Sequence, residues 1–188
     1  MQNQFEKHDY SIDLLKANLI SLPISLGILI FYSFIFYFAN SFKGISIFSD
    51  SEFVYYLFIP LLIVGISVHE ILHGLVFVIF SKIKFIDLKF GFKLSAFTFY
   101  AHCKKPVRLG LYKLSTVTPA VLLGVIPFII SILINSFMLF VWGVFFTITA
   151  AGDFLILWLL KGVENNTFVE DHPSRLGCIV LKKRTDVK

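Results

Sequence analysis

The sequence predicts an all-α integral membrane protein with four transmembrane helices, both termini cytoplasmic, and a small cytoplasmic β-hairpin between the second and third helices. Hydrophobic residues make up 57% of the 188 residues, whereas charged residues make up 15%. Soluble domains have about 45–50% apolar and about 25% charged residues. Mean hydropathy is +0.83, and four apolar segments are each long enough to cross about 30 Å of hydrocarbon. We therefore expect residues 1–188 to form a single membrane domain.

The four membrane-spanning helices are predicted at residues 17–39, 53–80, 115–134 and 137–160. Each contains at least 20 predominantly apolar residues, and about 20 is the length that a spanning helix needs. Only a short polar turn near Asn135-Ser136 separates the last two, which predicts a helical hairpin. Residues 81–114 then form a loop, and residues 161–188 form a tail.

Basic residues predict the orientation of these helices, because Lys and Arg accumulate in cytoplasmic loops. All 17 Lys and Arg residues except Lys43 lie in the N-terminal segment, the loop 81–114 or the tail. These three regions are therefore expected to be cytoplasmic, and the second and fourth helices run in the same direction. The net charge of +5 fits basic loops beside anionic membrane lipid. Nucleic acid is not expected as a partner of so apolar a chain.

The loop between the second and third helices has a different pattern. Residues 82–85 and 87–94 alternate polar and apolar side chains around Gly91, and residues 96–100 continue with β-favouring types. A period of two residues is typical of strands. We expect a β-hairpin or small sheet here on the cytoplasmic side.

The second predicted helix contains the sequence His69-Glu70-Ile71-Leu72-His73. An ionised side chain at the centre of a spanning helix costs about 2.5–3.5 kcal/mol on insertion scales, so such residues usually face a bundle interior or a water-filled cavity. Residues i and i+4 share one face of a helix, so His69 and His73 can bind one metal ion. Glu70 can serve as the general base of a zinc peptidase. The other interpretation of the two His residues is a hydrogen-bonded polar patch between helices.

A catalytic zinc takes three protein ligands and keeps one position open. Asp153 is the candidate for the third ligand, because it is the one acidic residue in the fourth predicted helix. It lies seven residues before Leu160, and His73 lies seven residues before Phe80. At about 1.5 Å per residue, both sit about 10 Å from the cytoplasmic boundary. A helix cap or an outer hydrogen-bonding partner of the site is the alternative role for Asp153.

Other polar residues have weaker claims. His102, after the predicted hairpin, is a candidate for substrate binding, for stabilising an oxyanion or for replacing Asp153 as ligand, although a loop His is more often simply solvated. Glu164 is a further candidate third ligand. Asp171 and His172 precede a proline and are expected in a turn. Cys103 and Cys178 fall in predicted cytoplasmic segments, where a disulfide is not expected.

Five motifs in this chain carry a resemblance to a known family: His69–Gly74, Tyr100–Pro106, Thr118–Ala120, Ala151–Asp153 and Asp171–Cys178. Over roughly residues 55–182, the chain resembles the bacterial family described as putative zincin peptidases. More remotely, it is similar to the site-2 proteases, intramembrane zinc enzymes with HExxH on one helix and an Asp ligand on a later one. The resemblance implies that His69, His73 and Asp153 bind Zn²⁺ and that Glu70 activates water.

The chain departs from the site-2 protease pattern in the fourth helix. Those proteases place the Asp in an Asn-Pro…Asp-Gly context, whereas here Gly152 precedes Asp153 and Phe154 follows it. The fourth predicted helix has no Asn-Pro dipeptide, so an Asn that orients substrate has no counterpart.

The leading hypothesis is a zinc metallopeptidase, a multi-pass protein of the bacterial cell membrane, that hydrolyses peptide bonds of a peptide or membrane-protein substrate in or near the membrane. Four helices form a thin wall around such a site, which makes a homodimer plausible. One alternative is a metal-binding membrane protein without hydrolytic activity, such as a transporter, a sensor or an inactive relative. The other is an interaction module in which the HExxH sequence occurs by chance.

Overall fold

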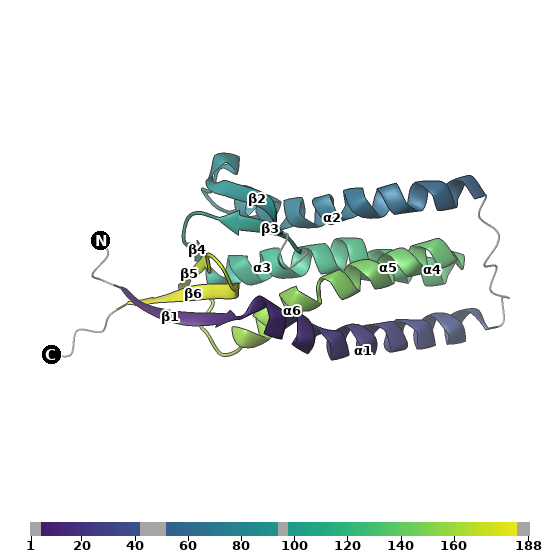
Figure 1. Cartoon of the computed structure of the whole chain (residues 1–188), viewed down its shortest axis with the longest axis horizontal. Coiled ribbons are helices and arrows are strands. Elements are labelled where there is room, and N and C mark those ends of the chain that lie inside the picture. The colour runs from purple at the N-terminus through teal and green to yellow at the C-terminus, as the bar shows by residue number, and fades with distance from the viewer. Residues whose placement is uncertain (1–4, 42–51, 94–97, 184–188) are drawn as a thin grey trace.

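The computed structural model describes residues 5–41, 52–93 and 98–183. Within them, four helices are long and apolar enough to span a membrane: Leu14–Asn40, Tyr56–Phe80, Leu109–Ile134 and Phe137–Leu159. The helices lie alongside one another and the strands gather at one end of them (Figure 1). This confirms a mostly helical fold with four membrane-length helices. The side of the membrane on which the strands lie remains a prediction.

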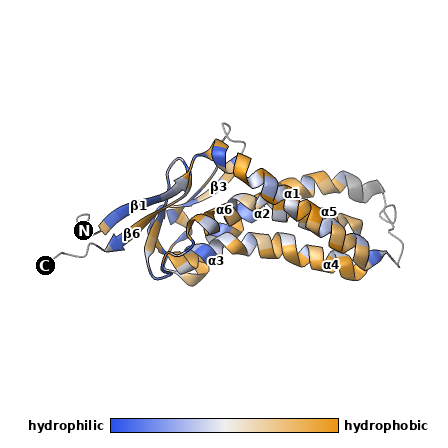
Figure 2. Ribbon diagram, turned by 90° about the horizontal axis from the view of Figure 1, so that it is seen from below, coloured by the Kyte–Doolittle hydropathy of each residue, from blue (hydrophilic) through white to orange (hydrophobic). Residues whose placement is uncertain are grey.

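The first helix, α1 (Leu14–Asn40), begins where the Asp13 side chain accepts a hydrogen bond from the Leu15 N–H at 3.0 Å. Such an N-cap satisfies a backbone donor that has no partner within the helix. Only 11% of the most apolar window of α1 is buried inside the protein, and hydrophobic residues predominate along the helical ribbons (Figure 2). An apolar surface of this kind is compatible with a membrane protein, because exposure of so much apolar surface to water is unfavourable.

The second helix, α2, covers Glu52–Phe80. The third span consists of α3 (Leu109–Pro119), a π-helical segment (Ala120–Val125) and α4 (Ile126–Ile134). Its helix begins at Leu109, six residues before the span predicted at 115–134. The first turns carry Lys113, which ended the apolar window in the sequence, but they bury Leu109 and Tyr112 in the core. Their amphipathic pattern belongs to a helix that extends beyond the hydrocarbon region.

The fourth span is interrupted at Ala150, between α5 (Phe137–Thr149) and α6 (Ala151–Leu159). The predicted helical hairpin is confirmed, since α4 ends at Asn135 in the left-handed conformation (φ 56°) and Ser136 caps α5. Asn tolerates positive φ better than most residues. α4 and α5 approach closely at Gly143, where an added Cβ would lie 2.8 Å from the Phe128 backbone nitrogen.

The described strands form two sheets at the same end of the helices. β2 (Leu88–Lys93) and β3 (Thr98–Cys103) pair antiparallel, as predicted, whereas residues 94–97 between them lie outside the described residues. A second, four-stranded sheet has the order β1-β6-β5-β4 and joins β1 (Phe5–Ile12), β4 (Val107–Arg108), β5 (Phe168–Asp171) and β6 (Leu176–Lys183). The sequence analysis predicted no strand in the N-terminal segment or the tail. The pairing of β1 with β6 joins segments about 170 residues apart, and no local pattern reveals such a partner.

One hydrophobic core connects the helix ends to the four-stranded sheet. Phe77 from α2 and Leu160 after α6 pack with Val169 and Val180 from the sheet. Leu160, Val169 and Val180 have no exposed surface. A separate cluster, built on Tyr32 and Phe128, lies among the helices, with the two rings stacked 3.8 Å apart. The sheet is therefore packed rigidly on the helices that carry the polar residues described below.

We expect Gly143→Ala to destabilise the protein by about 1–3 kcal/mol, the usual cost of overpacking. The added Cβ would meet backbone atoms of the neighbouring helix at 2.8–2.9 Å. Thermal unfolding in detergent measures the effect. Gly27→Ala in α1 is the matched control, because its Cβ would have no neighbour within 4 Å. Equal midpoints for the two variants would contradict the close packing of α4 and α5.

Candidate metal centre

The polar residues of α2 face one side of the helix. The nitrogen and oxygen ligand atoms of His69, Glu70 and His73 all lie within 4.8 Å of one another. The two imidazole rings have centroids 5.0 Å apart, which is the neighbour spacing expected for positions i and i+4. Their side chains are 7% and 13% exposed. The helix therefore gathers three ionisable groups at one largely buried place.

Asp153 approaches this group from the first turn of α6. Its Oδ2 lies 3.2 Å from His69 Nε2, and its Oδ1 lies 3.6 Å from His73 Nε2. The interruption at Ala150 redirects the chain just before this residue, and an added Cβ at Gly152 would meet only the tip of Leu176, at 3.9 Å. The structure thus places Asp153 beside His73, which the sequence predicted at the same depth, and beside His69.

A hydrogen bond from α3 orients His73. The backbone carbonyl of Ser115 lies 3.0 Å from His73 Nδ1, and a carbonyl can only accept, so Nδ1 carries the proton. The Ser115 hydroxyl donates in return to the His73 carbonyl at 2.8 Å. Nε2 is left to face Asp153. Metal-binding His residues usually donate their second ring nitrogen in this way. Sequence reasoning missed Ser115, because its carbonyl is a backbone group common to all residues.

The donor set fits a zinc ion. Two ligand atoms about 2.0–2.1 Å from a tetrahedral zinc lie about 3.4 Å from each other. The two contacts of Asp153 with imidazole nitrogens, at 3.2 and 3.6 Å, are close to that spacing. Two imidazoles and a carboxylate with a Glu beside them are also the ligand types of catalytic zinc sites. His69 Nδ1 is buried without a hydrogen-bond partner among the described residues. No hydrogen bond there therefore fixes the orientation of the His69 ring, whereas the Ser115 carbonyl fixes that of His73.

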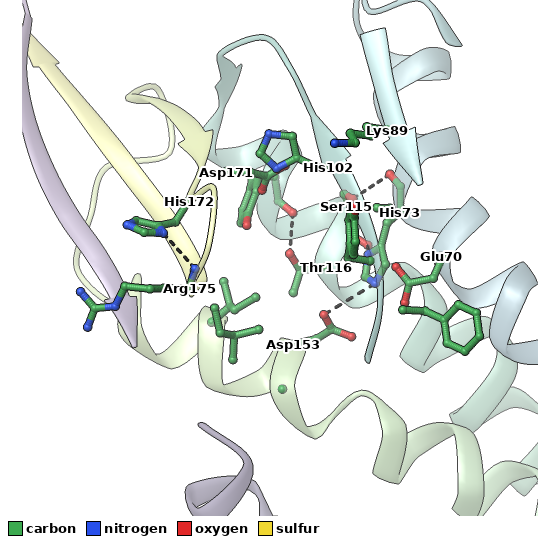
Figure 3. Close-up of a pocket in the computed structure, with 18 of the residues that line it drawn as sticks. Glu70, His73, Lys89, His102, Ser115, Thr116, Asp153, Asp171, His172 and Arg175 are labelled. Atoms are coloured by element: carbon green, nitrogen blue, oxygen red, sulfur yellow. Dashed lines mark hydrogen bonds and ion pairs between the residues drawn. The ribbon is translucent and has the colours of Figure 1, made fainter. Parts of the chain in front are cut away.

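These residues line a cavity of about 720 Å³. Figure 3 shows Glu70, His73 and Asp153 on one side of it and residues of the strands on the other. The backbone N–H of Ala101 in β3 lies within hydrogen-bonding reach of the Glu70 carboxyl. The cavity therefore lies between apolar helices and a strand, which gives a peptide room beside the polar group.

Asp171, at the end of β5, is a functional candidate that sequence reasoning assigned to a turn. Its side chain is 14% exposed, and its Oδ2 accepts a hydrogen bond from the Cys103 N–H at 2.7 Å. The Tyr112 hydroxyl faces the same carboxylate, and His102 Nδ1 lies 3.7 Å away. Burial raises the pKa of Asp171. Asp171 opens one of the motifs of the family resemblance, but the sequence did not show that its carboxylate would be buried, because its partners come from distant segments.

The remaining candidates fall into two groups. His102 lines the cavity and faces Asp171 rather than the group around Asp153. His172 lies in the predicted turn, where its Nδ1 accepts hydrogen bonds from the Ser174 and Arg175 N–H groups at 3.2 and 3.0 Å. Glu164 is exposed and is not among the residues that line the cavity. The structure therefore places neither His102 nor Glu164 beside His69 and His73.

The chain belongs to the family described as "Putative zincin peptidase", whose model matches residues 62–168, more than half of the sequence. This confirms the family that the motifs indicated. The match includes the HExxH sequence and Asp153 and ends at the start of β5. No curated protein and no solved structure matches the chain.

We expect the thiols of Cys103 and Cys178 to resist alkylation in the folded protein. Both are free and buried. Burial raises the pKa of Cys103, and it raises the pKa of Cys178 to about 12. The reactive thiolate is therefore scarce at pH 8. Mass spectrometry after iodoacetamide treatment, in detergent and then in denaturant, measures this protection. Rapid labelling of either thiol before denaturation would contradict the packing of the strands around Asp171.

Proposed function

We propose that this protein is a zinc-dependent intramembrane metallopeptidase, in which His69, His73 and Asp153 bind Zn²⁺ and Glu70 is the general base. The observation that carries the proposal is the convergence of His69, His73 and Asp153 from two membrane-length helices, with Glu70 beside them. Ionisable side chains within a span are costly, and several of them at one place indicate a functional site. Membership of the zincin peptidase family supports the same chemistry.

A bound zinc ion would act as a Lewis acid that polarises the scissile carbonyl and lowers the pKa of water. Glu70, within 4.8 Å of both imidazoles, is placed to take a proton from the attacking water and to deliver it to the leaving amine. The oxygen of the water bonds to the carbonyl carbon, and one of its protons passes through Glu70 to the leaving amine, so the reaction is balanced. The Ser115 carbonyl holds His73 in the tautomer that leaves Nε2 free to bind metal.

The outer edge of β3 is our candidate for the substrate-binding surface. An extended peptide can add to an exposed strand edge through main-chain hydrogen bonds. Ala101 is within reach of Glu70, so a peptide on this edge would lie beside the general base. A substrate helix must unwind locally, because a helix keeps its amides in internal hydrogen bonds. His102, which lines the same cavity, is a further substrate-contacting candidate.

We also propose that the site lies on the cytoplasmic side of the cell membrane, about one-third of the way into it. The Lys and Arg residues gather in the segments at the strand end of the helices, in agreement with the positive-inside rule. Cytoplasmic water can then reach the cavity through its open side, and the other face of the helices stays in lipid.

Zinc stoichiometry tests the metal site. We expect about one zinc per chain in wild type and Glu70→Gln, measured by elemental analysis of protein purified in detergent without chelator. His73→Ala and Asp153→Ala should each lose most of the metal, because each removes one of three ligands. Glu164→Ala is the matched control, since this exposed carboxylate lies away from the cavity. A wild-type protein without zinc would refute the proposal, and retention in Asp153→Ala would assign the third ligand elsewhere.

Hydrolysis is tested on a proteome-derived peptide library incubated with the detergent-purified protein, with new termini identified by mass spectrometry. We expect wild type to generate termini that Glu70→Gln generates roughly 10²–10⁴-fold more slowly, the usual contribution of a general base. Both proteins should hold equal zinc, which separates loss of the base from loss of metal. Equal numbers of termini from the two proteins, or none from zinc-loaded wild type on peptides or on membrane-embedded substrates, would favour a metal-binding protein without peptidase activity.

A further inference from the structure

The Asp171 carboxylate has no cationic partner of the usual kind. No Lys or Arg nitrogen of the described residues lies within 4.0 Å of it, and its one ion-pair neighbour there is His102. Burying a carboxylate without a close, well-satisfied counter-ion is usually less stable than an apolar side chain of similar size. Stability alone therefore gives a poor reason for this residue, and it lines the cavity of the candidate metal centre.

Asp171 connects the two sheets. β2 and β3 form a sheet of their own, separate from the sheet that contains β5. The hydrogen bond from the Cys103 N–H to Asp171 Oδ2, at 2.7 Å, joins the outer edge of β3 to the end of β5. Tyr112 adds a third element, α3, to the same carboxylate. The Asp171 side chain therefore ties β3, which also pairs with β2, to the other sheet.

The N–H groups of β3 alternate in direction, and this shows which edge of the strand Asp171 contacts. The Lys104 N–H donates toward β2, to the Asp87 carbonyl at 2.9 Å, whereas the Cys103 N–H points away from β2 toward Asp171. Amides alternate in direction along a strand, so the Ala101 N–H also lies on the outer edge, where Glu70 is within its reach. Two residues span about 6.8 Å of antiparallel strand. Asp171 and Glu70 therefore contact the same edge, two residues apart.

We propose that Asp171 is a positioning residue that fixes the outer edge of β3 beside Glu70 and ends, at Ala101, the part of that edge available to a bound peptide. This inference rests on the proposed peptidase function and adds a determinant of how the substrate is held. The Cys103 amide is occupied by Asp171, so a peptide paired with the Ala101 carbonyl on this edge must end or turn away before it reaches Cys103. The carboxylate also excludes an acidic side chain from that end by like-charge repulsion.

Two hydroxamates separate positioning from metal binding. Acetohydroxamate binds a zinc ion through its metal-chelating group alone, whereas a peptidyl hydroxamate carries the same group and a backbone that pairs with a strand edge. Both are titrated into zinc-loaded, full-length protein in detergent. We expect Asp171→Ala to weaken the peptidyl hydroxamate by at least about tenfold, as loss of hydrogen bonds to a charged group predicts. Acetohydroxamate should change by less than about twofold.

Three further variants sharpen the test. Asp171→Asn should restore most of the affinity, because the amide oxygen can still accept from the Cys103 N–H. Glu170→Ala is the matched control, since this neighbour in β5 pairs with Lys7 at 3.4 Å on the other side of the strand. If Asp171→Ala does not fold, Tyr112→Phe removes the hydroxyl that faces the same carboxylate and should weaken the peptidyl hydroxamate selectively.

Equal losses for both hydroxamates, or none in any folded variant, would overturn the inference and leave the proposed function standing. Failure of zinc-loaded wild type to bind acetohydroxamate would instead remove the proposed metal chemistry, and this inference with it.

Discussion

The contact of Asp153 with His69 and His73 is the constraint on which the rest of the structure depends. Burying any one of these polar side chains in an apolar span is unfavourable. The cost is lower when all three lie together and line one cavity. The contact fixes how α2 and α6 face each other, at 3.2 and 3.6 Å. The interruption of the fourth span at Ala150 lies three residues before Asp153, at the start of α6.

The strands serve this same site from outside the apolar region. The core around Leu160, Val169 and Val180 holds the four-stranded sheet against the helix ends. β5 and the turn after it then form one wall of the cavity, and β3 forms another. A cavity built only from helices would present side chains to a substrate. The strand edge adds backbone groups, which can recognise an extended peptide whatever its side chains. The combination suits the proposed peptidase, which would hold an unwound segment beside lipid.

Much of this arrangement could be predicted from the sequence, for identifiable reasons. Span length and hydropathy are local properties, so the four helices were found, although the third began earlier because Lys113 masked its amphipathic first turns. Alternation over residues 82–100 indicated β2 and β3. Asp153 was found by counting residues to the helix ends, which works because helical rise is constant. The four-stranded sheet was missed, since β1 and β6 owe their pairing to one another across the whole chain.

The sequence by itself determined the residue types and spacing of the candidate centre: two His residues on one helix face, the Glu between them and an Asp at the same depth on another helix. Hydrophobicity and helical period act locally, so they can be read without knowledge of the fold. Only the tertiary structure decided that the Ser115 carbonyl orients His73 and that Asp171 is buried against β3. Both interactions use a backbone group or a common side chain, and they arise only when segments far apart in the chain pack together.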